Sequence, residues 1–201
     1  MIKSKDYIVG FSTAIPGYYD VDELERLYDL TITLPQDSII VEIGVEYGRS
    51  ASIFLQLKKH WKELWLIDNR SHNAEEGRTS TWRLVERFGD DFGSGGGKIR
   101  VLEESSETAA INTKNDPPWI DLLHIDADHE QGVHLDCELW LPKLRIGGIV
   151  VFHDFERKGA DPSTGSVFPE VDKAVYYYTG DTNKWQDLGT INTQAVRRKL
   201  A

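Results

Sequence analysis

Acidic and hydroxyl side chains stand at or just after the ends of the predicted strands. They are Glu42, Asp68, Ser105, Ser106, Asp126 and Asp154. In an open α/β sheet the carboxyl ends of parallel strands meet at one edge, so we expect these groups to lie together. Carboxylates that lie so close repel one another unless a cation or a set of hydroxyl groups lies among them. The pattern therefore predicts a site for a small ligand that carries positive charge or hydroxyl groups.

A glycine turn follows the first of these strands. In the segment IIVEIGVEYGRS, residues 39–50, Glu42, Gly44 and Gly48 form an E-x-G-x-x-x-G pattern. Glycine lets the backbone turn tightly and lets a ligand approach closely. A dinucleotide-binding turn would carry G-x-G-x-x-G, so the smaller number of glycines favours a ligand without phosphates. Asp68, at the end of the next strand, is placed to accept hydrogen bonds from both ribose hydroxyls of an adenosine.

The elements that position these residues alternate between strand and helix. Apolar runs predict strands at 38–43, 63–68, 98–103, 119–126 and 149–153, and a closing strand pair at 185–188 and 193–198. Helical spacing predicts helices from Val21, at 49–60, at 74–88, after Ser105, over the segment that contains Val133 and Leu144, and at 169–178. The fold class predicted is α/β: a doubly wound, mostly parallel Rossmann-like sheet with a C-terminal antiparallel strand pair, in three α/β/α layers.

Length and composition limit the classes of protein. The 201 residues suffice for one domain, 1–201. Within it we expect an N-terminal helical substrate or lid segment (1–36), a cofactor-binding core (37–153), and a lid loop with closing elements (154–201). The formal net charge of −10 disfavours a nucleic acid partner. The expected substrate is therefore a small molecule.

Cellular location follows from what the chain contains. It has no apolar run of membrane-spanning length, no secretory signal pattern, and a single cysteine, Cys137, which we interpret as a buried, inert thiol. We therefore expect a cytoplasmic protein with no membrane partner. The sequence leaves homo-oligomer formation open.

The glycine turn and the segment HIDADHEQGVHLDCELWLPKLRIGGIVVFHDF, residues 124–155, resemble a known family. The chain resembles the class I S-adenosylmethionine-dependent methyltransferases, and within them the macrocin-type sugar O-methyltransferases; the catechol-type enzymes are more distant. The resemblance implies S-adenosylmethionine as cofactor. The cofactor-binding residues expected from it are Glu42, Gly44, Gly48, Asp68, Ser105, Ser106 and Asp126.

The same resemblance implies a divalent metal site. The metal-dependent members bind Mg²⁺ or another divalent cation through an acid after the fourth strand and an acidic pair after the fifth, which correspond to Asp126, His153 and Asp154. The macrocin-type pattern has Glu where this chain has His153. Imidazole makes the site less favourable for Mg²⁺ and more acceptable to a softer ion. The alternative for His153 is a core histidine.

A general base is expected at His129. It lies three residues beyond Asp126, the spacing of the base in the macrocin-type enzymes. Sugar and phenol hydroxyls are poor nucleophiles until deprotonated, and histidine can take that proton near neutral pH. The alternative for His129 is a helix-capping residue, while Asp128 is a second candidate ligand or a partner of the imidazole. His124 and His134 are interpreted as structural.

The sequence thus predicts an enzyme that methylates a small-molecule hydroxyl of a sugar or phenol, with possible assistance from a metal. Tyr18, Tyr19 and residues 154–168 are expected to close over the substrate. One alternative is a non-catalytic protein that binds an adenosyl cofactor. The other is a nucleotide-dependent oxidoreductase, which the missing third glycine disfavours.

Overall fold

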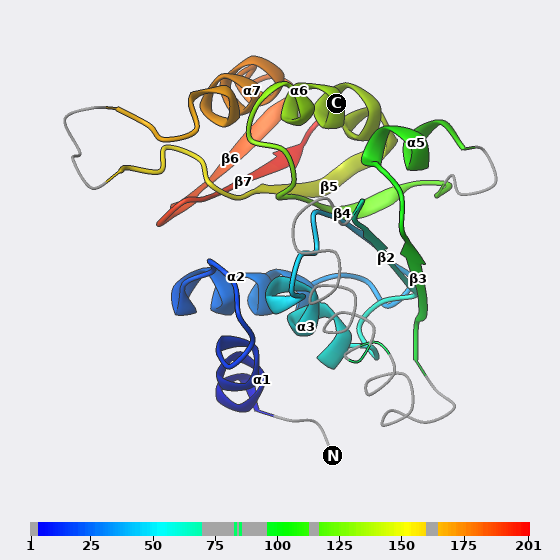
Figure 1. The fold of residues 1–201 in the computed structure, drawn as a ribbon. Coiled ribbons are helices and arrows are strands. Elements are labelled where there is room, and N and C mark those ends of the chain that lie inside the picture. The colour runs from blue at the N-terminus through cyan, green and yellow to red at the C-terminus, as the bar shows by residue number, and fades with distance from the viewer. Residues whose placement is uncertain (1–3, 70–82, 84, 86–95, 113–116, 160–164) are drawn as a thin grey trace.

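A seven-stranded sheet forms the centre of the molecule (Figure 1). The computed structural model describes residues 4–69, 83, 85, 96–112, 117–159 and 165–201. The strand order is β3-β2-β1-β4-β5-β7-β6. The bounds are β1 Ile39–Ile43, β2 Glu63–Ile67, β3 Lys98–Leu102, β4 Ile120–Ile125, β5 Leu144–Phe152, β6 Trp185–Ile191 and β7 Gln194–Lys199. Strands β1 to β5 pair in parallel, whereas β7 is antiparallel to both β5 and β6. The predicted fold class is confirmed.

Helices cover both faces of this sheet (Figure 1). One layer contains α1 Lys5–Thr13, α2 Val21–Ile32 and α3 Arg49–Gln56; the other contains α5 Ser106–Ile111, α6 Gln131–Trp140 with the short 3-10 helix η2 Leu141–Lys143, and α7 Pro169–Thr179. Alternate residues of β1 pack into the two layers: Ile39 and Val41 join the apolar cluster beneath α5–α7, and Ile40 joins the cluster beneath α1–α3. Both faces of the sheet are thus buried, which explains its nearly continuous apolar strands.

The structure differs from the sequence predictions at several helices. Helix α1 was not expected; Ser4 caps it by accepting from the backbone N–H of Tyr7, and Ile8 and Val9 anchor it in the core. The helix predicted to reach residue 60 ends at Gln56. The helix predicted at 74–88 lies largely outside the described residues. Among the described residues, no helix has both the length and the apolar character that crossing a membrane requires.

A capping box is present at the start of α2. The backbone N–H of Asp20 donates to Glu23 Oε2 at 2.9 Å, and the Asp20 side chain caps the third residue of the helix. The second oxygen of Glu23 accepts from the backbone N–H and the hydroxyl of Thr193, each at 2.9 Å. Glu23 therefore joins the N-terminal helices to the turn between β6 and β7.

The turn after β1 brings the chain close to the end of β4. Gly44 has φ +83°, and its N–H donates to the carbonyl of Ile67 at 2.9 Å. A Cβ at this position would lie 2.0 Å from the carbonyl oxygen of Asp126. Only glycine meets both the backbone conformation and the space available. This contact holds the carboxyl ends of β1, β2 and β4 together.

Gly44 and Gly147 form a matched pair for testing this contact. Both have φ +83°, but a Cβ at Gly147 would have no described atom within 4 Å. We expect Gly147→Ala to cost about 1 kcal/mol of unfolding free energy from backbone strain alone, and Gly44→Ala to cost about 3 kcal/mol or more because a clash is added. Urea denaturation measures both values. Equal losses of unfolding free energy in the two variants would show that the close approach of Gly44 to Asp126 does not restrict the residue at position 44.

Candidate active site

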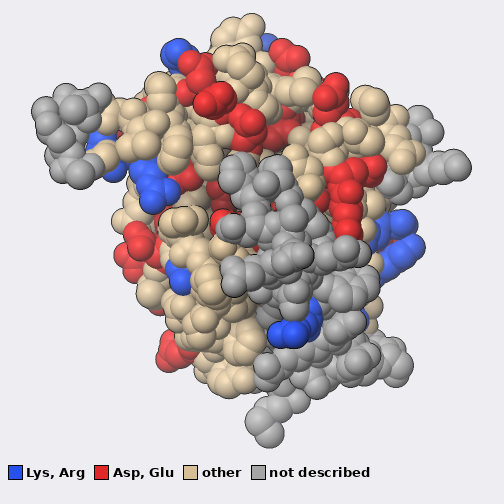
Figure 2. All heavy atoms as spheres, in the orientation of Figure 1, with Lys and Arg blue, Asp and Glu red and all other residues tan. Residues whose placement is uncertain are grey.

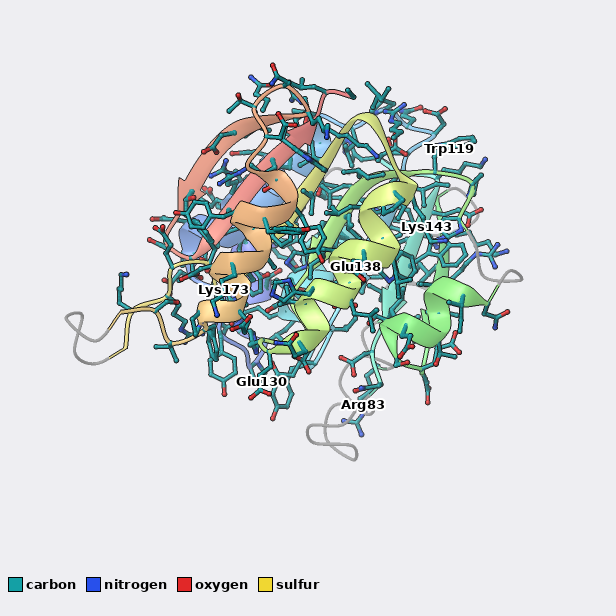
Figure 3. The ribbon with its side chains drawn as sticks, turned by 90° about the horizontal axis from the view of Figure 1, so that it is seen from above. Arg83, Trp119, Glu130, Glu138, Lys143 and Lys173 are labelled. Carbon is teal, nitrogen blue, oxygen red and sulfur yellow. The ribbon has the colours of Figure 1, made fainter. Side chains whose placement is uncertain are left out.

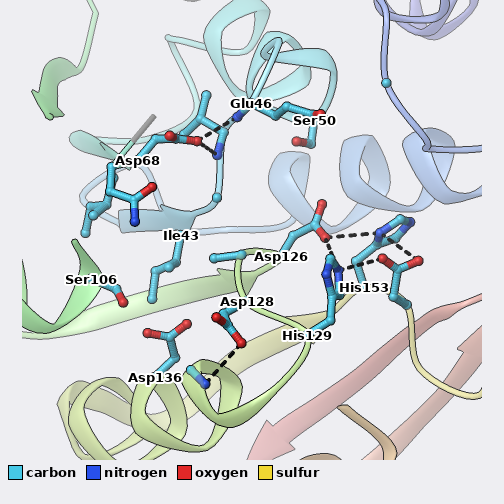
Figure 4. Close-up of a pocket in the computed structure, with 18 of the residues that line it drawn as sticks. Ile43, Glu46, Ser50, Asp68, Ser106, Asp126, Asp128, His129, Asp136 and His153 are labelled. Atoms are coloured by element: carbon cyan, nitrogen blue, oxygen red, sulfur yellow. Dashed lines mark hydrogen bonds and ion pairs between the residues drawn. The ribbon is translucent and has the colours of Figure 1, made fainter. Parts of the chain in front are cut away.

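A cavity of about 560 Å³ lies at the carboxyl edge of the parallel strands (Figure 4). The predicted site residues that line it are Gly44, Asp68, Ser105, Ser106, Asp126, His129, His153 and Asp154. The loops after β1, β2, β3, β4 and β5 supply them, so the expectation that strand ends converge is met. Glu42 and Gly48 are not among the described residues that line the cavity.

Carboxylates dominate the polar lining of the cavity. The acidic residues that line it are Glu46, Asp68, Glu107, Asp126, Asp128, Asp136 and Asp154. Figure 2 shows further acidic side chains gathered over the part of this face that α5, α6 and α7 form. Such a field attracts cations and hydrogen-bond donors and repels anions. The cavity therefore suits a ligand with a positive charge and hydroxyl groups.

Asp68 is held in place by the glycine turn. Its Oδ2 accepts from the backbone N–H groups of Val45 and Glu46, each at 2.8 Å. These two hydrogen bonds orient the carboxylate and also support the positive φ of 47° at Glu46. A carboxylate oriented in this way at the end of β2 has the chemistry to accept from a ribose, and that role of Asp68 stays a prediction.

Glu42 points to the opposite face of the sheet. It is fully buried beneath α1–α3, and its Oε1 accepts from Ser50 Oγ at 2.5 Å and lies 3.2 Å from His124 Nδ1. The other ring nitrogen of His124 meets the hydroxyl of Tyr19. Burial raises the pKa of Glu42, although His124 and Ser50 oppose the shift. Glu42 therefore reaches the cavity only indirectly, through Ser50 and Tyr19, which line it.

His153 lies between three carboxylates. Its Nδ1 is 3.2 Å from Asp126 Oδ1 and 3.6 Å from Asp154 Oδ1, and its Nε2 is 3.4 Å from Glu23 Oε2. The ring stacks on Tyr19 with centroids 3.9 Å apart. Burial alone would lower the pKa of His153, but Asp126 and the two other carboxylates raise it to about 12. No local pattern in the sequence indicates that the capping residue Glu23 reaches this site.

His129 lies at the rim of the cavity, beside the same acids. Its Nε2 is 2.8 Å from Asp154 Oδ2 and 3.9 Å from Asp126 Oδ1, and its ring stacks on Phe168 with centroids 4.2 Å apart. Its side chain is 31% exposed to the cavity, although Nε2 itself is buried against Asp154. Burial lowers the pKa of His129, but Asp154 and Asp126 outweigh burial and raise it.

Two arginines that the sequence analysis did not single out hold the walls of the cavity. Arg157 Nη1 lies 2.6 Å from Asp154 Oδ1. Arg49, at the start of α3, donates to the carbonyls of Ile15 and Tyr19 at 2.7 and 2.8 Å. Arg49 thereby fixes the segment between α1 and α2, which lines the cavity.

Three side chains at this end of the cavity can be tested for fit to a metal ion. The donor atoms of Asp126, His153 and Asp154 lie within 4.8 Å of one another. Glu23 stands behind the imidazole, as a carboxylate commonly does behind a metal-bound histidine. The donor set of two carboxylates and one imidazole therefore fits a divalent cation of borderline softness better than Mg²⁺.

Comparisons with known proteins agree with this geometry. A family model described as a methyltransferase domain matches residues 41–155. No curated protein matches the chain.

Solved structures share the fold at low sequence identity. They include an O-methyltransferase from Bacillus cereus in complex with SAH (15% identity, 98% of this chain and 90% of that chain, TM-score 0.64). They also include the TDP-rhamnose 3'-O-methyltransferase CalS11 of calicheamicin biosynthesis (19%, 87% and 77%, TM-score 0.62). An rRNA methylase from Streptococcus thermophilus has the same fold (17%, 89% and 97%, TM-score 0.59).

The family match covers more than half of the chain and spans the glycine turn, Asp68, Asp126, His129, His153 and Asp154. The parallel strands and the antiparallel β7 match the fold class predicted from the pattern of strands and helices in the sequence. The chain therefore belongs to this methyltransferase-domain family and is a class I S-adenosylmethionine-dependent methyltransferase.

Proposed function

We propose that this enzyme methylates a hydroxyl oxygen of a small molecule, a sugar or a phenol, with His129 as the general base. The observation that carries the proposal is the placement of His129 Nε2. This atom is buried and lies 2.8 Å from Asp154 Oδ2, and the partly exposed His129 side chain lines the same cavity that contains Asp68. When bound, S-adenosylmethionine supplies an electrophilic methyl group on a sulfonium centre.

The cavity residues divide the binding of this cofactor between them. Asp68 accepts from the ribose hydroxyls, and the segment with Ser105 and Ser106 contacts the adenine. Gly44 leaves room for close approach of the ligand to the backbone, and Asp126 faces the positively charged end. Glu42 and Gly48 support the turn from behind, because Glu42 bonds Ser50 and Gly48 begins α3 with φ +86°. The carboxylates around the cavity favour a cationic ligand.

His129 removes the proton of the acceptor hydroxyl. The carboxylate of Asp154 contacts His129 Nε2, so it orients the imidazole ring and stabilises the imidazolium that forms. Phe168 stacks on the ring and restricts its rotation. Holding the hydroxyl and the methyl donor together removes much of the entropic barrier to the transfer.

The closing elements come from both ends of a single domain. The segment with Tyr18 and Tyr19 contributes one wall. Arg157 and Phe168, which are described residues of the expected lid segment 154–168, contact Asp154 and His129. Arg157 lies over the rings of Tyr18 and Phe168 at 5.8 and 5.9 Å. These contacts support a lid that excludes water from the acceptor.

The acceptor is small for an electrostatic reason. The same fold occurs in an rRNA methylase and in a TDP-rhamnose 3'-O-methyltransferase. The formal net charge of −10 and the acidic lining repel a phosphate backbone. The likeness to the TDP-rhamnose 3'-O-methyltransferase supports a sugar as the acceptor. Aromatic side chains such as Phe168 suit either a sugar face or a phenol ring.

The His129 role can be tested once an acceptor is found by screening sugars, phenols and carboxylates for release of S-adenosylhomocysteine (SAH). We expect His129→Ala to lower kcat by about 100-fold to 10,000-fold, because proton removal is lost. Binding of SAH, measured by calorimetry, should change by less than about twofold because the cofactor does not depend on the base.

His134→Ala is the matched control, since His134 is also a half-buried histidine beside a carboxylate, Glu170, but lies on α6 away from the acids of the site. It should leave turnover unchanged. Turnover that survives in His129→Ala would place the base elsewhere.

We further propose that Asp126, His153 and Asp154 hold a divalent cation that assists this reaction. The donors converge, and the negative potential that favours a proton on His153 favours a metal ion in the same place. A coordinated hydroxyl has a lowered pKa, which would help its deprotonation by His129. Glu23 fixes the orientation of the His153 ring through Nε2.

Metal binding is measured directly, without an activity assay. Titration of the metal-free protein with Mn²⁺, followed by electron paramagnetic resonance, should show one site that Mg²⁺ competes for only weakly. His153→Ala should weaken Mn²⁺ binding by at least about tenfold, whereas His134→Ala should not change it. Mn²⁺ that does not bind at millimolar concentration would contradict the metal proposal and leave the methyltransferase proposal intact.

A further inference from the structure

Asp136 is a buried carboxyl group that the proposed chemistry does not use. It lies on α6, is 1% exposed, and lines the cavity. Neither of its carboxyl oxygens has a hydrogen-bond partner of good geometry among the described residues. Burying such a group without a partner costs free energy, so its presence needs a reason.

The position of Asp136 separates it from the reacting end of the cavity. Figure 4 shows Ser106 and Asp136 facing each other at one end, with His129 and His153 at the other. Asp68, held by the glycine turn, projects from the wall above Ser106 in the same view. If Asp68 holds the ribose, as in the proposed function on which this inference rests, the base extends toward Ser106 and the sulfonium toward Asp126.

We propose that Asp136 recognises the adenine base of the cofactor by accepting a hydrogen bond from its exocyclic amino group. Adenine carries this donor beside a ring nitrogen that accepts. A carboxyl group can meet both: one oxygen accepts from the amino group, and in the neutral form the other donates to the ring nitrogen. The ligand thus supplies the partner that the protein does not.

The electrostatic state of Asp136 suits this role. Burial raises its pKa to about 6, with the nearby Ser106 hydroxyl opposing the shift and Asp128 adding to it. A carboxyl group with this pKa exists in both protonation states near neutral pH, so accepting and donating are both available. A purine base without the amino group offers no donor at this position, so one oxygen of Asp136 would stay without a partner.

The lack of a hydrogen-bond partner for Asp136 in the unliganded protein also explains how the site would select adenosine. A site built to hydrogen-bond a ligand group rejects an analogue without that group far more strongly than an apolar pocket does. Asp136 would therefore determine specificity for adenosine and does not touch the transferred methyl group.

Calorimetry with SAH and one analogue tests the assignment. In the analogue, the 6-deamino (purine) form of SAH, hydrogen replaces the exocyclic amino group, and the ring nitrogen beside it remains an acceptor. The wild type should bind SAH at least about tenfold more tightly, because only SAH donates to Asp136. In Asp136→Leu, which has similar size but no acceptor, the preference should fall to within about twofold.

Glu138→Gln is the matched control. Glu138 lies two residues further along α6, so it points to another side of the helix, and Figure 3 shows it on the exposed face. This variant also removes one negative charge from α6, and it should keep the full preference for SAH.

Each other outcome overturns a distinct claim. A wild type that binds both ligands equally, or an Asp136→Leu variant that loses affinity for both by the same factor, would refute the recognition of adenine by Asp136. A wild type that binds neither ligand at millimolar concentration would refute the proposed cofactor site itself. The wild-type comparison needs no variant, so the inference stays testable if Asp136→Leu does not fold.

Thermal unfolding without ligand gives an independent check. Asp136→Leu should raise the Tm of the unliganded protein by at least about 2 °C, because an unpartnered buried carboxyl is removed. Saturating SAH should then raise the Tm of the variant less than that of the wild type. A lower Tm in the unliganded variant would indicate that Asp136 has a structural partner and would contradict the inference.

Discussion

The repulsion between carboxylates at one edge of the sheet is the constraint on which the rest of the site depends. Parallel strands deliver Asp68, Asp126 and Asp154 to the same edge, and α2 adds Glu23 from the side. Such a group is stable only when positive charge or hydrogen-bond donors are placed among its members. His153, Arg157 and the backbone N–H groups of the glycine turn provide them. A ligand with a positive charge and hydroxyl groups reduces the repulsion between these carboxylates further.

The compensation is unevenly distributed along the cavity. At the end near β5, imidazole and guanidinium groups are in contact with each carboxylate, so that end is positioned before any ligand arrives. At the end near α6, Asp136 is buried without such a partner. The protein therefore tolerates a local loss of stability at one place, and recognition of a ligand there can offset it. The preorganised end near β5 serves the chemical step. The unmet hydrogen-bonding capacity of Asp136 serves the selection of the ligand.

The scaffold contributes rigidity at the points where loops could otherwise vary. Gly44 lets the turn after β1 lie against the backbone of Asp126, and Asp68 holds the next two N–H groups of that turn. Arg49 ties the segment between α1 and α2 to the start of α3. These three contacts join four separate loops into one wall, so that a change at any of them alters the shape of the cavity.

The sequence by itself determined the order of strands and helices, the glycine turn, and the edge at which Asp68, Asp126, His129 and Asp154 meet. It could do so because these signals are local, and because parallel pairing sends every strand end to one edge. Helix α1 has little beyond a capping serine and a short apolar face, so it was missed.

Only the tertiary structure decided which way individual side chains face and which distant residues they meet. Glu42 was expected at the cofactor, but both faces of β1 are buried, and a continuous apolar strand does not reveal which face a given residue takes. Glu23 reaches His153 across 130 positions of the chain, and the rotation of α6 turns Asp136 into the cavity. Contacts of this kind depend on how helices pack against the sheet, which no local pattern encodes.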